Sequence, residues 1–503
     1  QGGSNLKSIF NLIITSYLES IYLLPRLNSM LTRRSKLSFL LGTCSLFLWV
    51  NHPVTLATPI SQDNSPPSQF ICPADLATRI DRILARPDYQ GTYWGILVKS
   101  LNSQENLYSL HENNFFTPAS TAKLLTTAAA FSKFNRDYRL KTPILAQGNP
   151  PDLETLTLVG RGDATITTEK LEKLAEKLKE RGINSISRLI VVASPFVVSD
   201  SQKTWEWEDV FFDYAVPASS LVLNENSVTL RLLPRQLGQS LDLQWSDPIA
   251  AKQWLIENQT STAAQGSPNT LAIKGNLANN RLIITGSLAI DSQDDFNLAI
   301  PQPSEYFLDS WRNILEKAGI TVKTAEISSE ILGDEITNLE SEPLAYLVEK
   351  VNKNSDNLLA ETLLQMLGGV SGLQETLTKL GINSDSYKIG DGSGLSRQNL
   401  IKPKTLGQIL QIMAENPDYR RSLAIGGVDG TLTNRFRQTP LEGRLQAKTG
   451  TLTGVIALAG YLETADNQPL IFSIIVNNSD KLATTLRNGI DEVILLLGQL
   501  KRC

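Results

Sequence analysis

Histidine is nearly absent from this chain. Its 503 residues include two histidines, His52 and His111, beside three cysteines and three methionines. A histidine zinc site needs two or three imidazole ligands, and a Ser-His-Asp relay needs one that is well placed. We therefore expect neither, and a hydrolytic reaction must take its base from lysine, glutamate or aspartate. With 41% apolar and 19% charged residues, the composition is otherwise that of a globular protein. The length suits about three domains.

The N-terminal segment has the pattern of an export signal. A basic stretch over residues 30–36 precedes an apolar run over 37–50 and a stretch over 51–57 that ends in small residues. This order predicts a signal peptide over 30–57, with 1–29 as an upstream extension. The apolar run is shorter than the ~20 residues of a membrane span, although an uncleaved signal anchor is the alternative. Cys44 lacks a lipid-attachment motif. We expect an exported, periplasmic protein without a stable membrane span after cleavage.

Cleavage near Ala57 would make the chain more acidic. It would remove five of the 47 Lys and Arg and one of the 51 Asp and Glu, leaving 42 against 50. An acidic protein is a poor partner for nucleic acid or an anionic membrane surface. Two cysteines would remain, Cys72 and Cys503, one near each end. In an exported protein they can form a disulfide or stay as two free thiols.

The hydrophobic pattern divides the chain into three stretches. Residues 92–99 and 106–110 predict a hairpin, and 448–461 and 470–477 predict a strong antiparallel strand pair. Apolar spacing predicts helices over 74–86, 343–367 and 480–500. From about 140 to 336, short strand-like segments alternate with turns. One helix at 168–181 interrupts them, and 258–281 is expected to be loop with one short strand. This middle stretch has the pattern of a separate β-rich insertion.

Three short motifs carry side chains suited to acyl transfer. In Ser120-x-x-Lys123 the hydroxyl and the amine lie on one face of a helix, since positions i and i+3 are neighbours. Lys123 can act as a base only when neutral, and burial beside a second cation lowers a lysine pKa. Ser355-Asp-Asn357 adds a hydroxyl and an amide at a loop–helix junction. Taken singly, both motifs are also common as ordinary polar helix starts.

The third motif is Lys448-Thr449-Gly450, at the start of a predicted strand. Lys448 supplies the second cation, and Gly450 allows a substrate backbone to lie close to the strand. The next residue, Thr451, can offer its N–H to an oxyanion together with that of Ser120. Each such donor is typically worth about 3–4 kcal/mol of the barrier.

Ser-x-x-Lys, Ser-x-Asn and Lys-Thr-Gly, in this order, form the motif set of penicillin-recognising serine enzymes. The surrounding sequence resembles the D-alanyl-D-alanine carboxypeptidase/endopeptidase family, the class C low-molecular-mass penicillin-binding proteins. The likeness covers about residues 70–480. It is carried by FTPASTAKLLTTAAA (116–130), GRGDATIT (160–167), WEWEDVFFDYAVPASSLVLNENSV (205–228), NKNSDNLLAETLLQMLG (352–368), GDGSGLSRQNLI (390–401), GGVDGTLTNR (426–435) and AKTGTLTGVIALAGYL (447–462).

The resemblance implies an α+β fold with a β-lactamase/transpeptidase-like catalytic domain, an antiparallel sheet flanked by helices. One or two further β-rich domains would be inserted between the first and second motifs. We therefore expect the catalytic domain to be formed by 70–140 and 337–503, and the insertion by 141–336. The family's first and last helices pack side by side, which would bring Cys72 and Cys503 together. On that ground we predict a disulfide that closes nearly the whole mature chain.

The resemblance also implies the chemistry. Ser120 would be the nucleophile that forms an acyl-enzyme, with Lys123 as its base. Ser355 and Lys448 would pass the proton to the leaving D-alanine, Asn357 would hold the substrate amide, and Thr449 and Lys448 would bind its carboxylate. The substrates would be peptidoglycan stem peptides, with β-lactams as covalent inhibitors. No cofactor or metal is expected. The balance of carboxypeptidase and endopeptidase action, and the oligomeric state, stay open.

A second group of side chains follows by resemblance to members that act on diaminopimelate-containing peptides. Asp209 in WEWED and Arg397 in GSGLSR would bind the ammonium and the carboxylate of the diaminopimelate side chain, with Tyr214 as an apolar wall. Two opposite charges on one stereocentre need an acceptor and a bidentate donor. The alternative is that Asp209 and Arg397 are ordinary structural charges.

Two rival functions can be weighed from the sequence. A β-lactamase of the class A type needs a deacylating glutamate in a Glu-x-x-Leu-Asn loop, and no such loop lies between 358 and 447. We therefore expect a penicillin adduct to persist. A catalytically inert wall-binding protein on the same fold is the other rival. It is disfavoured because the serines, lysines and asparagine of all three motifs are intact.

Overall fold

The computed structural model describes residues 70–193, 203–276, 279–466, 468–501 and 503. The predicted extension over 1–29, the predicted signal peptide over 30–57, Cys44 and His52 lie outside these residues. Within the described ranges, no helix combines the length and apolar character that crossing a membrane requires.

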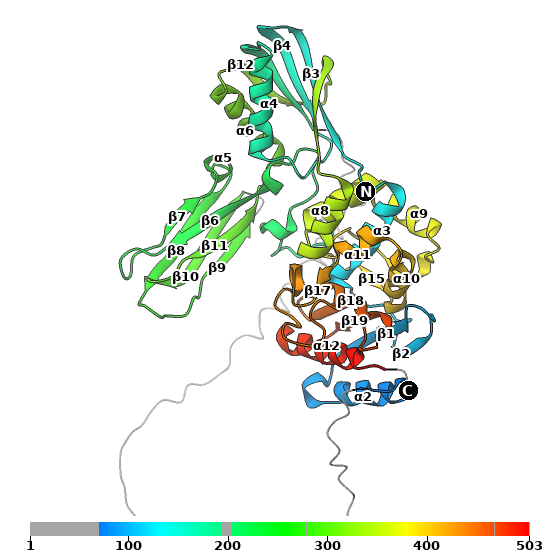
Figure 1. Cartoon of the computed structure of the whole chain (residues 1–503). Coiled ribbons are helices and arrows are strands. Elements are labelled where there is room, and N and C mark those ends of the chain that lie inside the picture. Colours follow the sequence, from blue (N-terminus) through cyan, green and yellow to red (C-terminus); the bar gives the residue numbers. More distant parts are fainter. Residues whose placement is uncertain (1–69, 194–202, 277–278, 467, 502) are drawn as a thin grey trace, which may run out of the picture. The chain divides into compact units, whose positions relative to one another are not determined.

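A six-stranded antiparallel sheet is built from strands near both ends of the described chain (Figure 1). Its strands, in order across the sheet, are β16 (Ala424–Ile425), β17 (Leu445–Leu452), β18 (Val455–Glu463), β19 (Pro469–Asn477), β1 (Tyr93–Ser100) and β2 (Asn106–Leu110). The predicted hairpin is thus β1 and β2. The single strand predicted over 448–461 is wrong, because the chain turns at Thr453 and Gly454 to give the β17–β18 hairpin. Gly454 has φ +72° at this turn.

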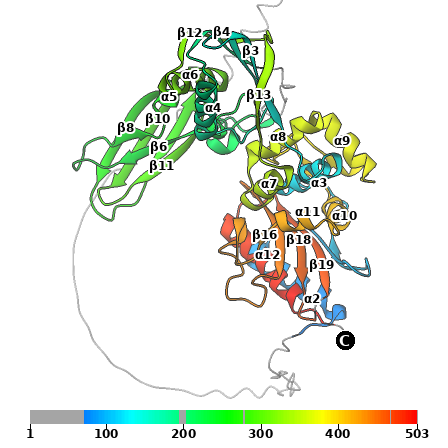
Figure 2. The same ribbon diagram turned by 45° about the horizontal axis from the view of Figure 1, so that its top comes forward.

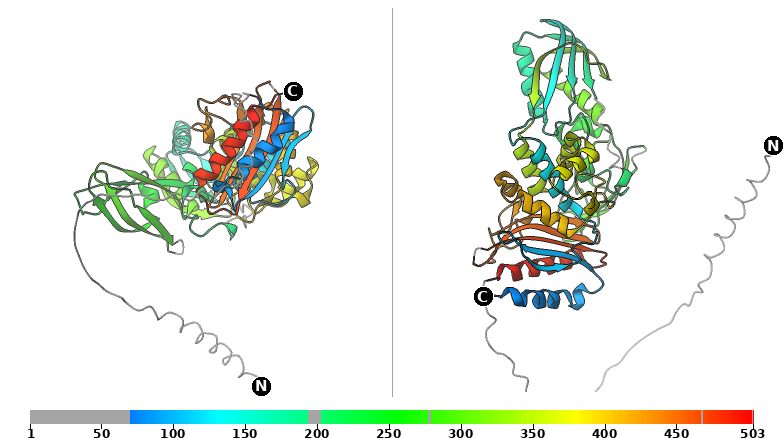
Figure 3. Two further views of the ribbon diagram at one scale, coloured as in Figure 1. Left: turned by 90° about the horizontal axis from the view of Figure 1, so that it is seen from below. Right: turned by 90° about the vertical axis from the view of Figure 1, so that its right-hand side faces the viewer.

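Helices cover both faces of this sheet. On one face α2 (Pro73–Leu84) and α12 (Ala483–Gly498) lie side by side, as Figure 3 shows. Leucine and isoleucine side chains of both helices pack with the strands in one apolar cluster. The segments just before α2 and just after α12 meet here, because the Ile71 N–H donates to the Gln499 carbonyl at 2.9 Å. A disulfide joins Cys72 to Cys503, with 5.6 Å between their Cα atoms.

The opposite face carries the helices beside which the first two motifs lie (Figure 2), whereas the third motif is on β17. These are α3 (Lys123–Lys133), α7 (Leu344–Glu349), α8 (Asn357–Leu367), α9 (Gly369–Lys379), α10 (Pro403–Met413) and α11 (Pro417–Ser422), with the short strands β14 (Tyr387–Lys388) and β15 (Leu400–Ile401) beside them. The continuous helix predicted over 343–367 is wrong. A π-helical turn over 350–354 ends at Ser355, whose φ is +64°, and α8 starts anew with Asp356 as its N-cap.

Between α3 and α7 the chain builds a five-stranded mixed sheet. It contains β3 (Lys141–Asn149), β4 (Asp152–Val159), β5 (Ser185–Val192), β12 (Thr321–Ser328) and β13 (Asp334–Glu340), in the order β12-β5-β4-β3-β13. The predicted helix appears as α4 (Thr168–Glu180), the crossover that makes β4 and β5 parallel. A second helix, α6 (Pro303–Lys317), was not predicted. Its Trp311 and Phe307 are fully buried in the same apolar cluster as α4.

Two three-stranded sheets complete the middle stretch. One is β11-β6-β7, from β6 (Ser227–Leu233), β7 (Asp242–Trp245) and β11 (Asp294–Ala299). The other is β8-β10-β9, from β8 (Leu255–Ala263), β9 (Ala272–Asn276) and β10 (Arg281–Ala289), with α5 (Pro248–Ala251) between β7 and β8. The expectation that 258–281 is loop with one short strand is therefore wrong, since most of β8 and all of β9 lie within it.

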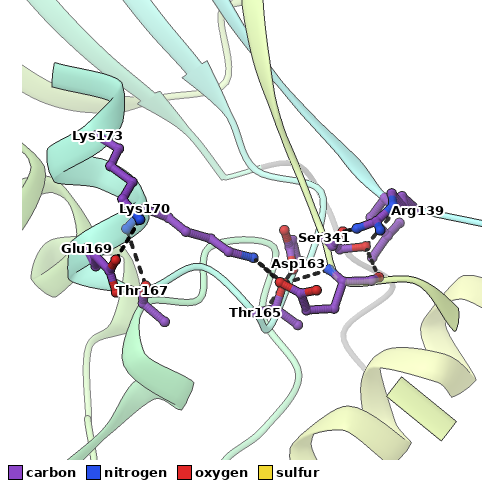
Figure 4. Close-up of polar contacts among 10 residues, drawn as sticks. Arg139, Asp163, Thr165, Thr167, Glu169, Lys170, Lys173 and Ser341 are labelled. Atoms are coloured by element: carbon purple, nitrogen blue, oxygen red, sulfur yellow. Dashed lines mark hydrogen bonds and ion pairs between the residues drawn. The ribbon is translucent and has the colours of Figure 1, made fainter. Parts of the chain in front are cut away.

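The chain enters and leaves this middle stretch at adjacent points. Ser341 and Leu140 exchange hydrogen bonds: the Ser341 N–H donates to the Leu140 carbonyl at 3.0 Å, and the Leu140 N–H donates to the Ser341 hydroxyl at 2.9 Å. The Arg139 guanidinium donates to the Ser341 carbonyl at 2.6 Å. Figure 4 shows Arg139 in contact with Ser341. Lys170 of α4 forms an ion pair with Glu342, the residue after Ser341, at 3.1 Å. The residues just before β3 and just after β13 are thus hydrogen-bonded to each other.

Candidate active site

Ser120 stands on a tight turn that leads into α3. Residues 119–122 form a single 3₁₀ turn, and the α-helix begins at Lys123. Ala119, just before the serine, has φ +47°, a conformation that a non-glycine residue adopts only at a cost. The turn places the Ser120 Oγ 2.9 Å from the Lys123 Nζ. The i, i+3 pairing expected from the sequence is therefore present.

Lys123 is fully buried, and its ammonium nitrogen has three acceptors. Besides Ser120 Oγ, Nζ donates to the Asn357 Oδ1 at 2.5 Å and to the Ser393 carbonyl at 2.6 Å. Burial lowers the pKa of Lys123 to about 8, although the nearby Asp391 and Glu361 carboxyls act in the opposite direction. A neutral amine is therefore accessible at this position near neutral pH.

The second and third motifs meet at Ser355. The Lys448 Nζ of β17 donates to the Ser355 Oγ at 2.9 Å and to the Thr449 carbonyl at 2.9 Å. Lys448 is also fully buried. Burial and the charge of Lys123 hold its pKa well below the usual range. Each of the two lysines thus contacts one serine hydroxyl. Asn357 of the second motif also contacts Lys123 of the first, so these two motifs are directly connected.

The edge of β17 runs close against the Ser120 turn. A Cβ added to Gly450 would lie 2.8 Å from the Pro118 carbonyl oxygen, so only glycine fits here without displacement. The Thr449 hydroxyl donates to the Thr431 hydroxyl at 2.8 Å. Ser120, Ser355, Asn357 and Thr451 line one cleft of about 350 Å³. The structure therefore brings residues of the first two motifs, and the residue that follows the third, together around one space.

The second predicted group lines the same cleft. Asp209, Tyr214 and Arg397 all border it. The Tyr214 hydroxyl donates to the Asp209 Oδ1 at 2.8 Å, so this tyrosine presents a polar tip as well as an apolar wall. Arg397 forms an ion pair with Glu206. Glu206 was missed in the sequence, although it belongs to the same acidic WEWED stretch as Asp209.

A buried loop over 390–396 contacts Lys123 through the Ser393 carbonyl. Asp391 accepts hydrogen bonds from the N–H groups of Gly394 and Ser396 at 2.8 and 2.6 Å. Its carboxylate also accepts from the Trp205 indole at 2.9 Å. Glu361 of α8 accepts from the Ser393 N–H at 2.8 Å. The sequence pointed to this loop only as a shaping element and gave no role to Glu361.

Other chemistry-bearing side chains lie elsewhere. The His111 Nδ1 is 2.9 Å from the Trp94 carbonyl and its ring stacks on Tyr93, which is a structural setting. Within the described part of the chain, no three His, Cys, Asp or Glu side chains are grouped so that they could hold a metal ion.

Comparison with known proteins gives the same family over most of the chain. The sequence model of the D-Ala-D-Ala carboxypeptidase 3 (S13) family matches residues 76–496. A D-alanyl-D-alanine carboxypeptidase from an Actinomadura species is 30% identical, over 80% of this chain and 81% of that protein. The D-alanyl-D-alanine carboxypeptidase DacB of Haemophilus influenzae is 26% identical, over 77% of this chain and 86% of that protein.

The fold has a solved counterpart. The crystal structure of penicillin binding protein 4 (dacB) from Haemophilus influenzae matches with a TM-score of 0.73 at 25% identity, and covers 82% of this chain and 99% of that one. The α+β fold of the transpeptidase type, expected from the resemblance, is confirmed. The chain is a serine peptidase and belongs to the D-Ala-D-Ala carboxypeptidase 3 (S13) family.

Proposed function

We propose that this chain is an exported, periplasmic serine DD-peptidase that cleaves peptidoglycan stem peptides through an acyl-enzyme on Ser120. The observation that carries this proposal is the pair of buried lysines, each in contact with one serine hydroxyl: Lys123 with Ser120, and Lys448 with Ser355, both at 2.9 Å. A nucleophile within hydrogen-bond reach of a base whose pKa is depressed is the requirement for covalent catalysis without histidine.

Acylation begins when neutral Lys123 takes the proton of Ser120 and the serine oxygen attacks the penultimate D-alanine carbonyl. The N–H groups of Ser120 and Thr451 stabilise the oxyanion of the tetrahedral intermediate. Collapse breaks the peptide bond, and the leaving amine receives a proton through Ser355 and Lys448. Water then attacks the ester, which frees Ser120 and the shortened peptide.

The cleft walls select the substrate. Asn357 holds the amide of the peptide, and Lys448 and Thr449 bind its terminal carboxylate. Asp209 and Arg397 bind the ammonium and carboxylate of a diaminopimelate side chain, with Tyr214 beside them. Arg397 is paired with Glu206 in this structure. The incoming carboxylate must therefore either displace Glu206 or bind Arg397 together with it.

The division of the chain is part of the proposal. Residues 70–140 and 337–503 form the catalytic domain, and 141–336 form the insertion, which the mutual fastening of Leu140 and Ser341 supports. The signal peptide over 30–57 delivers the enzyme to the periplasm, where its substrate lies.

Labelled penicillin tests the acyl-enzyme. The expected result is a stable adduct on the peptide that contains Ser120, located by mass spectrometry, and no adduct in Ser120→Ala. Rapid release of hydrolysed penicillin would instead indicate a β-lactamase, and no reaction at all would indicate an inert binding protein.

A cross-linked muropeptide then separates the two peptidase activities. Free D-alanine in the products indicates carboxypeptidase action, and un-cross-linked monomers indicate endopeptidase action. Either product, absent with Ser120→Ala, supports the proposed DD-peptidase.

A further inference from the structure

Glu361 is a buried carboxyl group that the proposed reaction does not use. It lies on α8 one turn after Asn357, with 1% of its surface exposed. Its Oε1 accepts the backbone N–H groups of Gly392 and Ser393, at 2.9 and 2.8 Å. Burial raises the pKa of Glu361 to about 8. A side chain this deeply enclosed cannot touch substrate, so any effect on the reaction must pass through the peptide it holds.

Ser393, whose N–H donates to Glu361, also carries one of the acceptors of Lys123. The carbonyl of Ser393 lies 2.6 Å from the Lys123 Nζ, and the Asn357 Oδ1 lies 2.5 Å from it. A neutral amine has two N–H bonds and one lone pair. If the two N–H bonds point to these two oxygens, the lone pair is left for the third neighbour, the Ser120 Oγ at 2.9 Å. This is the orientation that a base needs in order to take the serine proton.

The peptide groups before and after Ser393 are each held by a further side chain. The Thr126 hydroxyl donates to the Gly392 carbonyl at 2.8 Å. Asp391 anchors the following Gly394 N–H at 2.8 Å. Gly394 itself packs on the Ser120 turn, where a Cβ would come within 2.0 Å of the Ala119 carbonyl oxygen. The Ser393 carbonyl is thus fixed relative to the nucleophile.

We propose that Glu361 is a positioning residue for acylation: by fixing the Ser393 carbonyl, it orients the neutral amine of Lys123 with its lone pair toward Ser120. The inference rests on the proposed function, because it assigns Lys123 the role of base. It predicts a loss in the acylation step and no loss in the binding that precedes it.

Glu361→Gln and Glu361→Leu separate this role from general support of the fold. Glutamine keeps an oxygen for the two N–H groups, whereas leucine fills a similar volume without an acceptor. The control is Asp163→Asn, which alters another buried carboxyl whose pKa is raised by burial. The Asp163 carboxylate accepts hydrogen bonds from the N–H and the hydroxyl of Thr165, close to Ser341 (Figure 4). It makes no hydrogen bond to Lys123 or Lys448.

The measurement is rapid-mixing acylation by benzylpenicillin, which yields the dissociation constant of the first complex and the rate constant of acylation. General-base catalysis contributes about 10²–10⁴-fold. We expect Glu361→Leu to lower the acylation rate constant by about 10²-fold with an unchanged dissociation constant. Glu361→Gln and Asp163→Asn should stay within about threefold of wild type, which is small against that contribution.

Three results would overturn the inference: acylation of Glu361→Leu at the wild-type rate, an equal loss in Glu361→Gln, or a loss confined to the dissociation constant. Failure of wild type itself to be acylated at Ser120 would overturn the proposed function instead. If Glu361→Leu does not fold, Thr126→Val releases the carbonyl of the Gly392–Ser393 peptide, whose N–H donates to Glu361. A wild-type acylation rate constant in that variant would likewise refute the role of this peptide.

Discussion

Gly394 offers a sharp test of how closely the supporting loop must approach the nucleophile. Its φ is +84°, and an added Cβ would lie 2.0 Å from the carbonyl oxygen of Ala119 and 3.1 Å from the Cα of Ser120. Gly381 is a matched control. Its φ is +85°, and nothing lies within 4 Å of the same added atom. Alanine at either site has the same backbone cost, but only at Gly394 does it overlap with other atoms.

The expected magnitudes follow from this difference. The left-handed conformation costs an L-residue about 1–2 kcal/mol, which is the whole loss expected for Gly381→Ala. Overpacking adds about 1–3 kcal/mol, so Gly394→Ala should lose about 2–5 kcal/mol. The atom that must move belongs to Ala119, which already has φ +47°. The overlap therefore displaces Ser120, and a misplacement of about 1 Å can cost about 10²-fold in rate.

Urea unfolding and labelling with fluorescent penicillin measure the two effects. Gly394→Ala should unfold at lower urea than Gly381→Ala and should be acylated about 10²-fold more slowly than wild type. Gly381→Ala should be acylated normally. Equal stability losses in the two variants, together with wild-type labelling of Gly394→Ala, would refute the claim that the loop packs directly on the nucleophile turn.

Three further predictions concern protonation, specificity and the chain ends. Because the base must be neutral and the pKa of Lys123 is about 8, acylation should slow as the pH falls below about 8; a flat rate from pH 5 to 10 would contradict this. Arg397→Ala should reduce turnover of diaminopimelate-containing peptides far more than turnover of a generic D-Ala-D-Ala thioester. The control is Arg281→Ala, which removes a surface arginine that is also paired with a glutamate and should reduce neither activity. Equal losses on both substrates would contradict the proposed diaminopimelate subsite. Native protein should show no free thiol at Cys72 or Cys503. Cys503→Ser should lower the free energy of unfolding by about 5 kcal/mol, because in the chain-entropy model a cross-link that spans many residues stabilises most. An unchanged urea midpoint would show that the cross-link does not stabilise the fold.

The geometry within each motif could be predicted from the sequence because it is local, whereas the meeting of the three motifs was expected from the resemblance. The three-residue spacing of Ser120 and Lys123 sets their contact within one turn. Lys448, Thr449 and Gly450 share one strand edge. Glu361 could not be found in this way, since its partners are backbone N–H groups of a distant loop. A main-chain acceptor such as the Ser393 carbonyl leaves no mark in the residue type.

Two errors in the fold have a common physical cause. Strand β18 is buried along nearly its whole length, so 455–461 is an apolar run without alternation. The threonines of β17 before it also favour a strand, so the turn at Gly454 is hidden between two strand-like stretches. The apolar spacing of α7 and α8 likewise continues through Ser355, whose left-handed conformation the pattern does not reveal. In both places tertiary packing decides where an element ends.

The disposition of Leu140 and Ser341 bears on how such a protein can arise. Two points of the main chain that exchange hydrogen bonds are separated by little more than the width of a strand pair. A single recombination event at that place could add or delete the whole intervening segment without moving the catalytic helices on either side. Such an event would still change the cleft, because Asp209 and Tyr214, which border it, lie within the intervening segment.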